Sequence, residues 1–138
     1  MNFIKLGLSM SLMIAAQASQ AWTQVANCEA LGHSMTANLF TDGANFILHV
    51  GDKNSQSVLE FQTSTGAINL EKVLQRLNRG KRETINFSRT NAKDKPYPAD
   101  ANLSVKIQKD SETSEKSTLS LSGGANLEIN LKCTAPKE

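Results

Sequence analysis

The chain has 138 residues, of which 39% are hydrophobic, 20% are charged and 5% are aromatic, and its formal net charge is +2. This length suits one domain of ordinary size, and the apolar content argues against a disordered chain. The small net charge argues against nucleic acid as the partner, because nucleic-acid-binding domains are usually strongly basic.

The first 21 residues have the features of a secretory signal peptide. Lys5 precedes an uncharged apolar run at residues 6–16, and small residues at 16–18 and 19–21 fit two alternative signal peptidase sites. The run is too short for a transmembrane helix, which needs about 20 apolar residues. We therefore expect residues 1–21 to be removed, leaving a single domain at residues 22–138 that is periplasmic or secreted in a bacterium.

The rest of the chain is dominated by alternation of apolar and polar residues. Leu127, Ile129 and Leu131, for example, alternate with polar residues, which is typical of an antiparallel strand with one buried and one exposed face. Turn sequences such as Asp42-Gly43 and Gly123-Gly124 suit hairpins. About eight strands are predicted, at residues 22–31, 37–41, 44–50, 57–63, 83–89, 103–108, 118–122 and 125–133. The alternation predicts an all-β, mostly antiparallel barrel or sandwich and does not separate the two.

One segment has helical periodicity instead. Apolar residues recur at positions i, i+3, i+4 and i+7 of residues 70–77, which predicts an amphipathic helix between the fourth and fifth strands. Asn69 or Thr65 can cap its start, and Gly80 is placed to terminate it. We expect this short helix to cover an open end or edge of the sheet.

Basic residues are concentrated at the end of this helix and in the residues that follow it. Between residues 76 and 95 there are seven basic residues and two acidic ones. The segment ends in Lys95-Pro96-Tyr97-Pro98, a stiff loop with the chain's only tyrosine. An aromatic residue beside arginines is typical of binding interfaces. The predicted partner-binding residues are Arg76, Arg79, Lys81, Arg82, Arg89, Lys95 and Tyr97.

The chain contains two cysteines, Cys28 in the first predicted strand and Cys133 in the last. An even pair of cysteines in an exported protein is expected to form a disulfide. The spacing includes neither a Cys-X-X-Cys sequence nor a companion histidine that would indicate a metal or redox site. We therefore predict a Cys28–Cys133 disulfide that holds the terminal strands together.

No catalytic, cofactor-binding or metal-binding residue is assigned from the sequence. The two histidines, His33 and His49, lack a local nucleophile and acid that would complete a catalytic group. Asn86 and Asn102 each begin an Asn-X-Ser sequence, the acceptor pattern for N-glycosylation. Because the signal peptide is of bacterial type, we expect both to be unmodified.

These features favour a non-enzymatic exported binding protein that engages an acidic protein or an anionic polymer of the cell envelope through its basic segment. One alternative is a small-ligand carrier that uses the interior of the barrel. The other is a small hydrolase-type enzyme that pairs His33 or His49 with an acid from a neighbouring loop.

Overall fold

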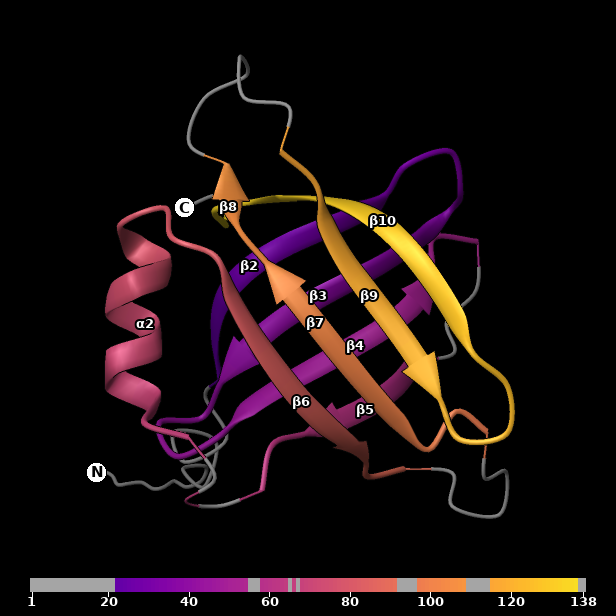
Figure 1. Ribbon diagram of the computed structural model, residues 1–138, viewed down its shortest axis with the longest axis horizontal. Coiled ribbons are helices and arrows are strands. Elements are labelled where there is room, and N and C mark those ends of the chain that lie inside the picture. Colours follow the sequence, from indigo (N-terminus) through magenta and orange to yellow (C-terminus); the bar gives the residue numbers. More distant parts are fainter. Residues whose placement is uncertain are drawn as a thin grey trace, which may run out of the picture.

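The computed structural model describes residues 22–54, 58–64, 66, 68–91, 97–108 and 115–136. These residues form a closed barrel of eight antiparallel strands, with one extra two-residue strand and one helix (Figure 1). The predicted signal peptide lies outside the described residues. Among the described residues, no helix is long and apolar enough to cross a membrane. The elements are β2 (Thr23–Ala30), β3 (Met35–Thr41), β4 (Phe46–Asp52), β5 (Val58–Gln62), α2 (Leu70–Asn78), β6 (Glu83–Arg89), β7 (Asp100–Val105), β8 (Ile107–Gln108), β9 (Ser117–Ser122) and β10 (Leu127–Thr134).

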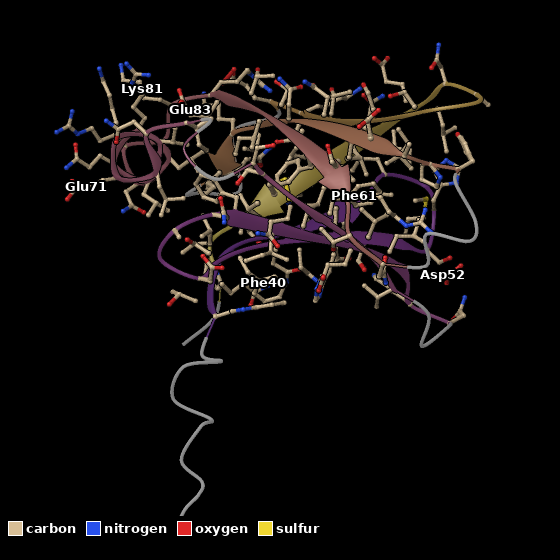
Figure 2. All side chains as sticks on the ribbon, turned by 90° about the horizontal axis from the view of Figure 1, so that it is seen from below. Phe40, Asp52, Phe61, Glu71, Lys81 and Glu83 are labelled. Atoms are coloured by element: carbon tan, nitrogen blue, oxygen red, sulfur yellow. A yellow bond between two sulfur atoms is a disulfide. The ribbon has the colours of Figure 1, made fainter. Side chains whose placement is uncertain are left out.

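The barrel is flattened into two layers that cross at an angle. Strands β2 to β5 form one layer, here called the back layer, and β6, β7, β9 and β10 form the front layer (Figures 1 and 2). Each strand of the barrel pairs with its neighbour in chain order, and β10 pairs with β2. The prediction of an all-β fold is confirmed, and this last pairing makes it a barrel.

The closing pair of strands carries the disulfide. Cys28 of β2 lies directly opposite Cys133 of β10, with their Cα atoms 4.0 Å apart, and the two sulfur atoms are bonded. Both side chains are completely buried in the core. The predicted disulfide between the terminal strands is therefore confirmed, and it suits a protein of an oxidising compartment.

Alternate residues of the strands fill the space between the two layers with one apolar cluster. Phe46, Leu48 and Val50 of β4 belong to this cluster, as their alternation requires. Ile47 is also buried, although it lies on the outer face, where its register partners are Phe40 of β3 and Gln62 of β5. Burial on both faces explains why this segment is continuously apolar.

Helix α2 begins and ends where its sequence predicts. The Asn69 side chain accepts a hydrogen bond from the backbone N–H of Lys72 (3.1 Å), which caps the first turn. At the other end Gly80 has a φ of 77°, and the N–H groups of Gly80 and Lys81 donate to the carbonyls of Leu77 and Arg76. This pair of bonds is a Schellman motif, which favours glycine at its left-handed position. Thr65, the alternative cap, is outside the described residues.

The helix covers a gap in the barrel, as expected. Strand β6 pairs with β5 only through Arg89 and Ser88, so its first five residues pair with β7 alone. Helix α2 lies beside this part of β6 (Figure 1). Its Leu77 is completely buried in the core cluster, and Leu70, Val73 and Leu74 pack against that cluster.

Two of the local differences between prediction and structure have a side-chain hydrogen bond as their cause. The Asp42-Gly43 turn is a four-residue loop, because the Asp42 carboxylate accepts hydrogen bonds from the N–H groups of Ala44 and Asn45 (both 2.8 Å). The strand predicted at residues 103–108 begins at Asp100 and is interrupted at Lys106. There the Ser117 hydroxyl accepts from the Lys106 N–H (3.0 Å) and takes the place of a ladder bond.

Candidate functional site

Four of the predicted partner-binding residues lie together at the C-terminal end of α2 and in the turn that follows. Arg76, Arg79, Lys81 and Arg82 are all exposed. The last carbonyl groups of a helix carry partial negative charge, so part of this positive charge stabilises the helix itself. We call these four residues, together with Lys106 and Lys116, the basic end.

The residues of the basic end differ in how firmly they are held. The Arg82 guanidinium donates to the Ser104 hydroxyl (3.2 Å) and to the Lys116 carbonyl (2.7 Å). Arg76 lies 3.7 Å from the Glu83 carboxylate. Within the part of the chain that the structure describes, the side chains of Arg79 and Lys81 have no hydrogen-bonding or ion-pair partner. Arg82 therefore fastens the turn to β7 and β9, while Arg79 and Lys81 are open to a partner.

Two lysines extend the basic end across the front layer. Lys116 is exposed just before β9, and Lys106, at the end of β7, forms an ion pair with Glu115. The hydrogen bond from Lys106, and then the charges of Lys106 and Arg82, hold the pKa of Glu115 below its ordinary value. Glu115 thus neutralises one lysine and leaves the end positive.

Two of the other three predicted binding residues, Arg89 and Tyr97, lie at the opposite end of β6. A seven-residue strand is about 20 Å long, so Arg89 and Tyr97 are far from the basic end. Arg89 donates to the carbonyls of Asn91 (2.8 Å) and Pro98 (2.9 Å), which holds the two ends of the intervening segment. Tyr97 is 38% exposed and lies against Gly124 in the turn between β9 and β10. Lys95 lies outside the described residues.

Between these two ends, the outer faces of β6, β7 and β9 carry small polar side chains, and Glu128 of the neighbouring strand β10 lies opposite Ser120. Residues directly opposite one another on β6, β7 and β9 form three rows. We call these nine residues the polar face: Thr84, Ser104 and Thr118; Asn86, Asn102 and Ser120; Ser88, Asp100 and Ser122. Eight of the nine are uncharged, so a neutral surface joins the basic end to the Tyr97 end.

The polar face includes a shallow groove of about 360 Å³. Its polar lining is made by Ser64, Asn86, Ser88, Asp100, Asn102 and Ser122. In its middle, the Asn102 amide donates to the Asn86 side-chain oxygen, and the Ser88 hydroxyl lies 3.5 Å from the Asp100 carboxylate. Since an amide group has two donor hydrogens and an acceptor oxygen, the Asn86–Asn102 pair keeps both donors and acceptors for a ligand.

The back layer brings a second group of chemically active side chains together on its outer face. His49 Nε2 lies 3.0 Å from Glu60 Oε2, and the Thr90 hydroxyl donates to Glu60 Oε1 (2.7 Å). The rings of Trp22 and Phe40 each lie 5.3 Å from the His49 ring. Figure 2 shows Phe40 on the outer side of this layer, away from the polar face. The rings of Trp22, Phe40 and His49 pack on one another, which indicates a structural cluster on the surface.

The Glu60 carboxylate is stabilised in its ionised form. Partial burial raises its pKa, but hydrogen bonds from His49 and Thr90 and the electrostatic attraction of His49 outweigh burial and hold the pKa below its ordinary value. A carboxylate whose pKa is lowered on folding adds stability above its unfolded pKa, and this stability is lost as the pH falls through the folded value.

We therefore expect the free energy of unfolding of the Glu60→Gln variant to depend less on pH in acid than that of the wild type. The wild-type protein should lose more free energy of unfolding than the variant between about pH 5 and pH 3, because only the wild type protonates this carboxylate. Urea unfolding at several pH values measures the difference, which should be well under 1 kcal/mol for so exposed a pair. If the free energy of unfolding fell equally with pH in the two proteins, Glu60 would not be the carboxylate whose pKa is lowered on folding.

The two histidines considered for catalysis, His33 and His49, do not lie in a common site. His33 is exposed in the turn between β2 and β3, whereas His49 lies in the middle of β4. Among the described residues, no group of three or more His, Cys, Asp or Glu side chains could hold a metal ion. A catalytic role for His33 or His49 therefore stays a prediction.

Several of these residues could not be singled out in the sequence. Glu60, Trp22 and the polar face become visible only when the strands are placed in register. The polar face could have been predicted from one feature of the sequence: the polar positions of the strands that became β6, β7 and β9 are mostly Ser, Thr or Asn.

No protein-family model, no curated protein and no solved structure matches this chain. Its function is therefore argued from the geometry of its surfaces.

Proposed function

We propose that this chain is an exported, non-enzymatic binding protein that engages an anionic partner, an acidic protein or an anionic polymer of the cell envelope, through the basic end. The observation that carries the proposal is that Arg79 and Lys81 are exposed and have no side-chain partner among the described residues, beside four further basic residues. Clustered charge of one sign raises the local concentration of an oppositely charged partner and speeds its association.

Export is part of the same proposal. The disulfide between the terminal strands suits an oxidising compartment, and the predicted signal peptide at residues 1–21 would deliver the chain to the periplasm or the medium. An exported protein would meet the anionic polymers and acidic proteins of the cell envelope.

Charge reversal of Lys81 tests the proposal. Binding of the oxidised protein to labelled polygalacturonate and labelled polyglutamate would be measured at about 0.1 M salt and again at about 1 M, where charges are screened beyond about 3 Å. We expect Lys81→Glu and Arg79→Glu each to weaken binding to at least one probe by about three- to tenfold. High salt should remove most of the binding.

The matched control is Lys53→Glu, which changes the net charge by the same amount. Lys53 is exposed and paired with Glu29, next to Asp52 at the end of the molecule opposite Lys81 (Figure 2). This control should leave binding within about twofold, since an exposed ion pair contributes little. Equal effects of Lys53→Glu and Lys81→Glu, or binding that survives at 1 M salt, would contradict a partner site at the basic end.

The two alternatives have less support in the geometry. A small-ligand carrier needs room inside the barrel, where the described residues place the packed apolar cluster. An enzyme needs a nucleophile or an activated water beside the His49–Glu60 pair. The outer surface of the front layer is therefore the better basis for a function.

A further inference from the structure

The polar face lies between the two parts of the predicted partner site. The basic end is at one end of β6, and Tyr97 is about 20 Å away at the other. A partner that touches both must therefore also cover the rows of Ser, Thr and Asn side chains between them. The chemistry of these rows then says what kind of partner fits.

These rows are poorly suited to an acidic protein surface. Protein interfaces usually have an apolar and aromatic centre, with charged residues at the rim. The centre of this face instead holds Asn86, Asn102 and Ser120, which are small and uncharged. An acidic protein would find positive charge only at one end of the face.

The same rows suit a chain of sugars. Neighbouring positions lie about 5 Å apart across the strands and about 7 Å apart along them, which is comparable to the size of one sugar unit. Hydroxyl and amide side chains both donate and accept hydrogen bonds, as sugar hydroxyls do. The groove of about 360 Å³, lined by Asn86, Asn102 and Ser122, gives such a ligand a place to lie.

The charges at the two ends of the polar face indicate that the ligand is acidic and how it is oriented on the face. Carboxylate or sulfate groups fit the basic end, where Arg79 and Lys81 are open. At the other end Asp100 is the one charged residue of the polar face, and its carboxylate accepts hydrogen bonds from hydroxyl groups. The half-exposed ring of Tyr97 adds an aromatic surface against which a sugar ring can pack.

We infer that the anionic partner is an acidic polysaccharide that lies along the polar face, with its acidic groups at the basic end and its sugar hydroxyls over the Asn86–Asn102 rows. This inference rests on the proposed function, because it names the class of ligand for the same site. The groove, the register of the rows and the charge of the basic end all support it.

The test uses a variant that changes the polar face and leaves every charge in place. In the double variant Asn86→Val, Asn102→Val, one exposed and one partly buried amide on the outer face are replaced by a residue that favours strands, so the barrel should fold. Binding of the oxidised protein to labelled polygalacturonate, polyglutamate and uncharged dextran would be compared. We expect the double variant to bind polygalacturonate at least tenfold more weakly and polyglutamate as the wild type does. Wild type should bind dextran far more weakly than polygalacturonate.

A matched control replaces two amide side chains of the other layer by valine. Asn38→Val and Gln62→Val remove two amides from the back layer, on strands β3 and β5, and should leave polygalacturonate binding unchanged. Thermal unfolding of each variant checks that the fold is kept.

The outcomes separate this inference from the proposed function. If the polar-face variant binds polygalacturonate as wild type does, while Lys81→Glu weakens it, the proposed function holds and the polysaccharide inference is overturned. If polyglutamate binds more tightly than polygalacturonate, the partner is an acidic protein and the inference is again overturned. If neither Lys81→Glu nor Arg79→Glu weakens binding to either probe, the proposed function itself fails.

Discussion

Replacement of both Cys28 and Cys133 by alanine should lower the free energy of unfolding by about 2–4 kcal/mol, and the midpoint of thermal unfolding by roughly 10 °C. The bond closes a loop of 105 residues, nearly the whole described domain. For a loop of this length the chain-entropy model gives about 4.7 kcal/mol, and measured values are usually smaller. Thermal and urea unfolding of the wild type and the double variant give both quantities.

The position of the bond explains why its loss should be felt throughout the molecule. It joins the one pair of neighbouring barrel strands that is farthest apart in the chain, β2 and β10. Without it, this closing contact must be formed by four register pairs of backbone and by the packing beneath them. The unfolded chain, meanwhile, regains the freedom of a 105-residue loop.

Reduction supplies a control that changes no residue. A reductant should lower the stability of the wild type to near that of the double alanine variant and should leave the variant itself unchanged. A loss below about 1 kcal/mol in both experiments would mean that the β2–β10 ladder closes the barrel by itself and that the bond is dispensable.

The sequence predicts the fold well because its local signals agree with one another. Alternation assigns the strands, Asn69 and Gly80 mark the ends of the helix, and the two cysteines identify the strands that close the barrel. Such agreement between local preference and tertiary structure is what makes a sequence specify one fold. The differences are at strand ends, where side chains such as Asp42 and Ser117 take over backbone hydrogen bonds.

The site is harder to predict because it depends on register. Alternation says which face a residue occupies, but it does not say which residue of the next strand lies opposite. Thus Asn86 and Asn102, 16 residues apart, meet on the polar face, and His49 meets Glu60 on the back layer. Conversely, the six predicted binding residues that the structure describes are close in sequence but are distributed between the two ends of β6, because an extended strand separates them.

The helix that carries the basic end should itself depend on a single buried side chain. We expect Leu77→Ala to lower the free energy of unfolding by about 2–5 kcal/mol, the range for a fully buried leucine that leaves a cavity. Leu77 is the one helix residue that is completely buried, and it belongs to the core cluster between the layers. Urea unfolding followed by circular dichroism measures the loss.

The structural reason for so large an effect is the gap that α2 covers. The first five residues of β6 pair with β7 alone, so the helix supplies the packing that β5 gives elsewhere. A nine-residue helix is marginal by itself in water and is stabilised mainly by the face it buries. Loss of Leu77 should therefore loosen the helix and the position of Arg79 together.

The companion variant Val73→Ala separates this anchoring from a general weakening of the helix. Val73 packs against the same cluster but is only half-buried, so its truncation should cost about 1 kcal/mol. Amide exchange should then speed up in α2 and in the first half of β6 for Leu77→Ala, with little change in β2 and β3. Equal costs for the two variants, or faster exchange spread evenly over the barrel, would mean that Leu77 does not anchor the helix across the gap. In that case the basic end would be held in place chiefly by the hydrogen bonds of Arg82 to Ser104 and Lys116.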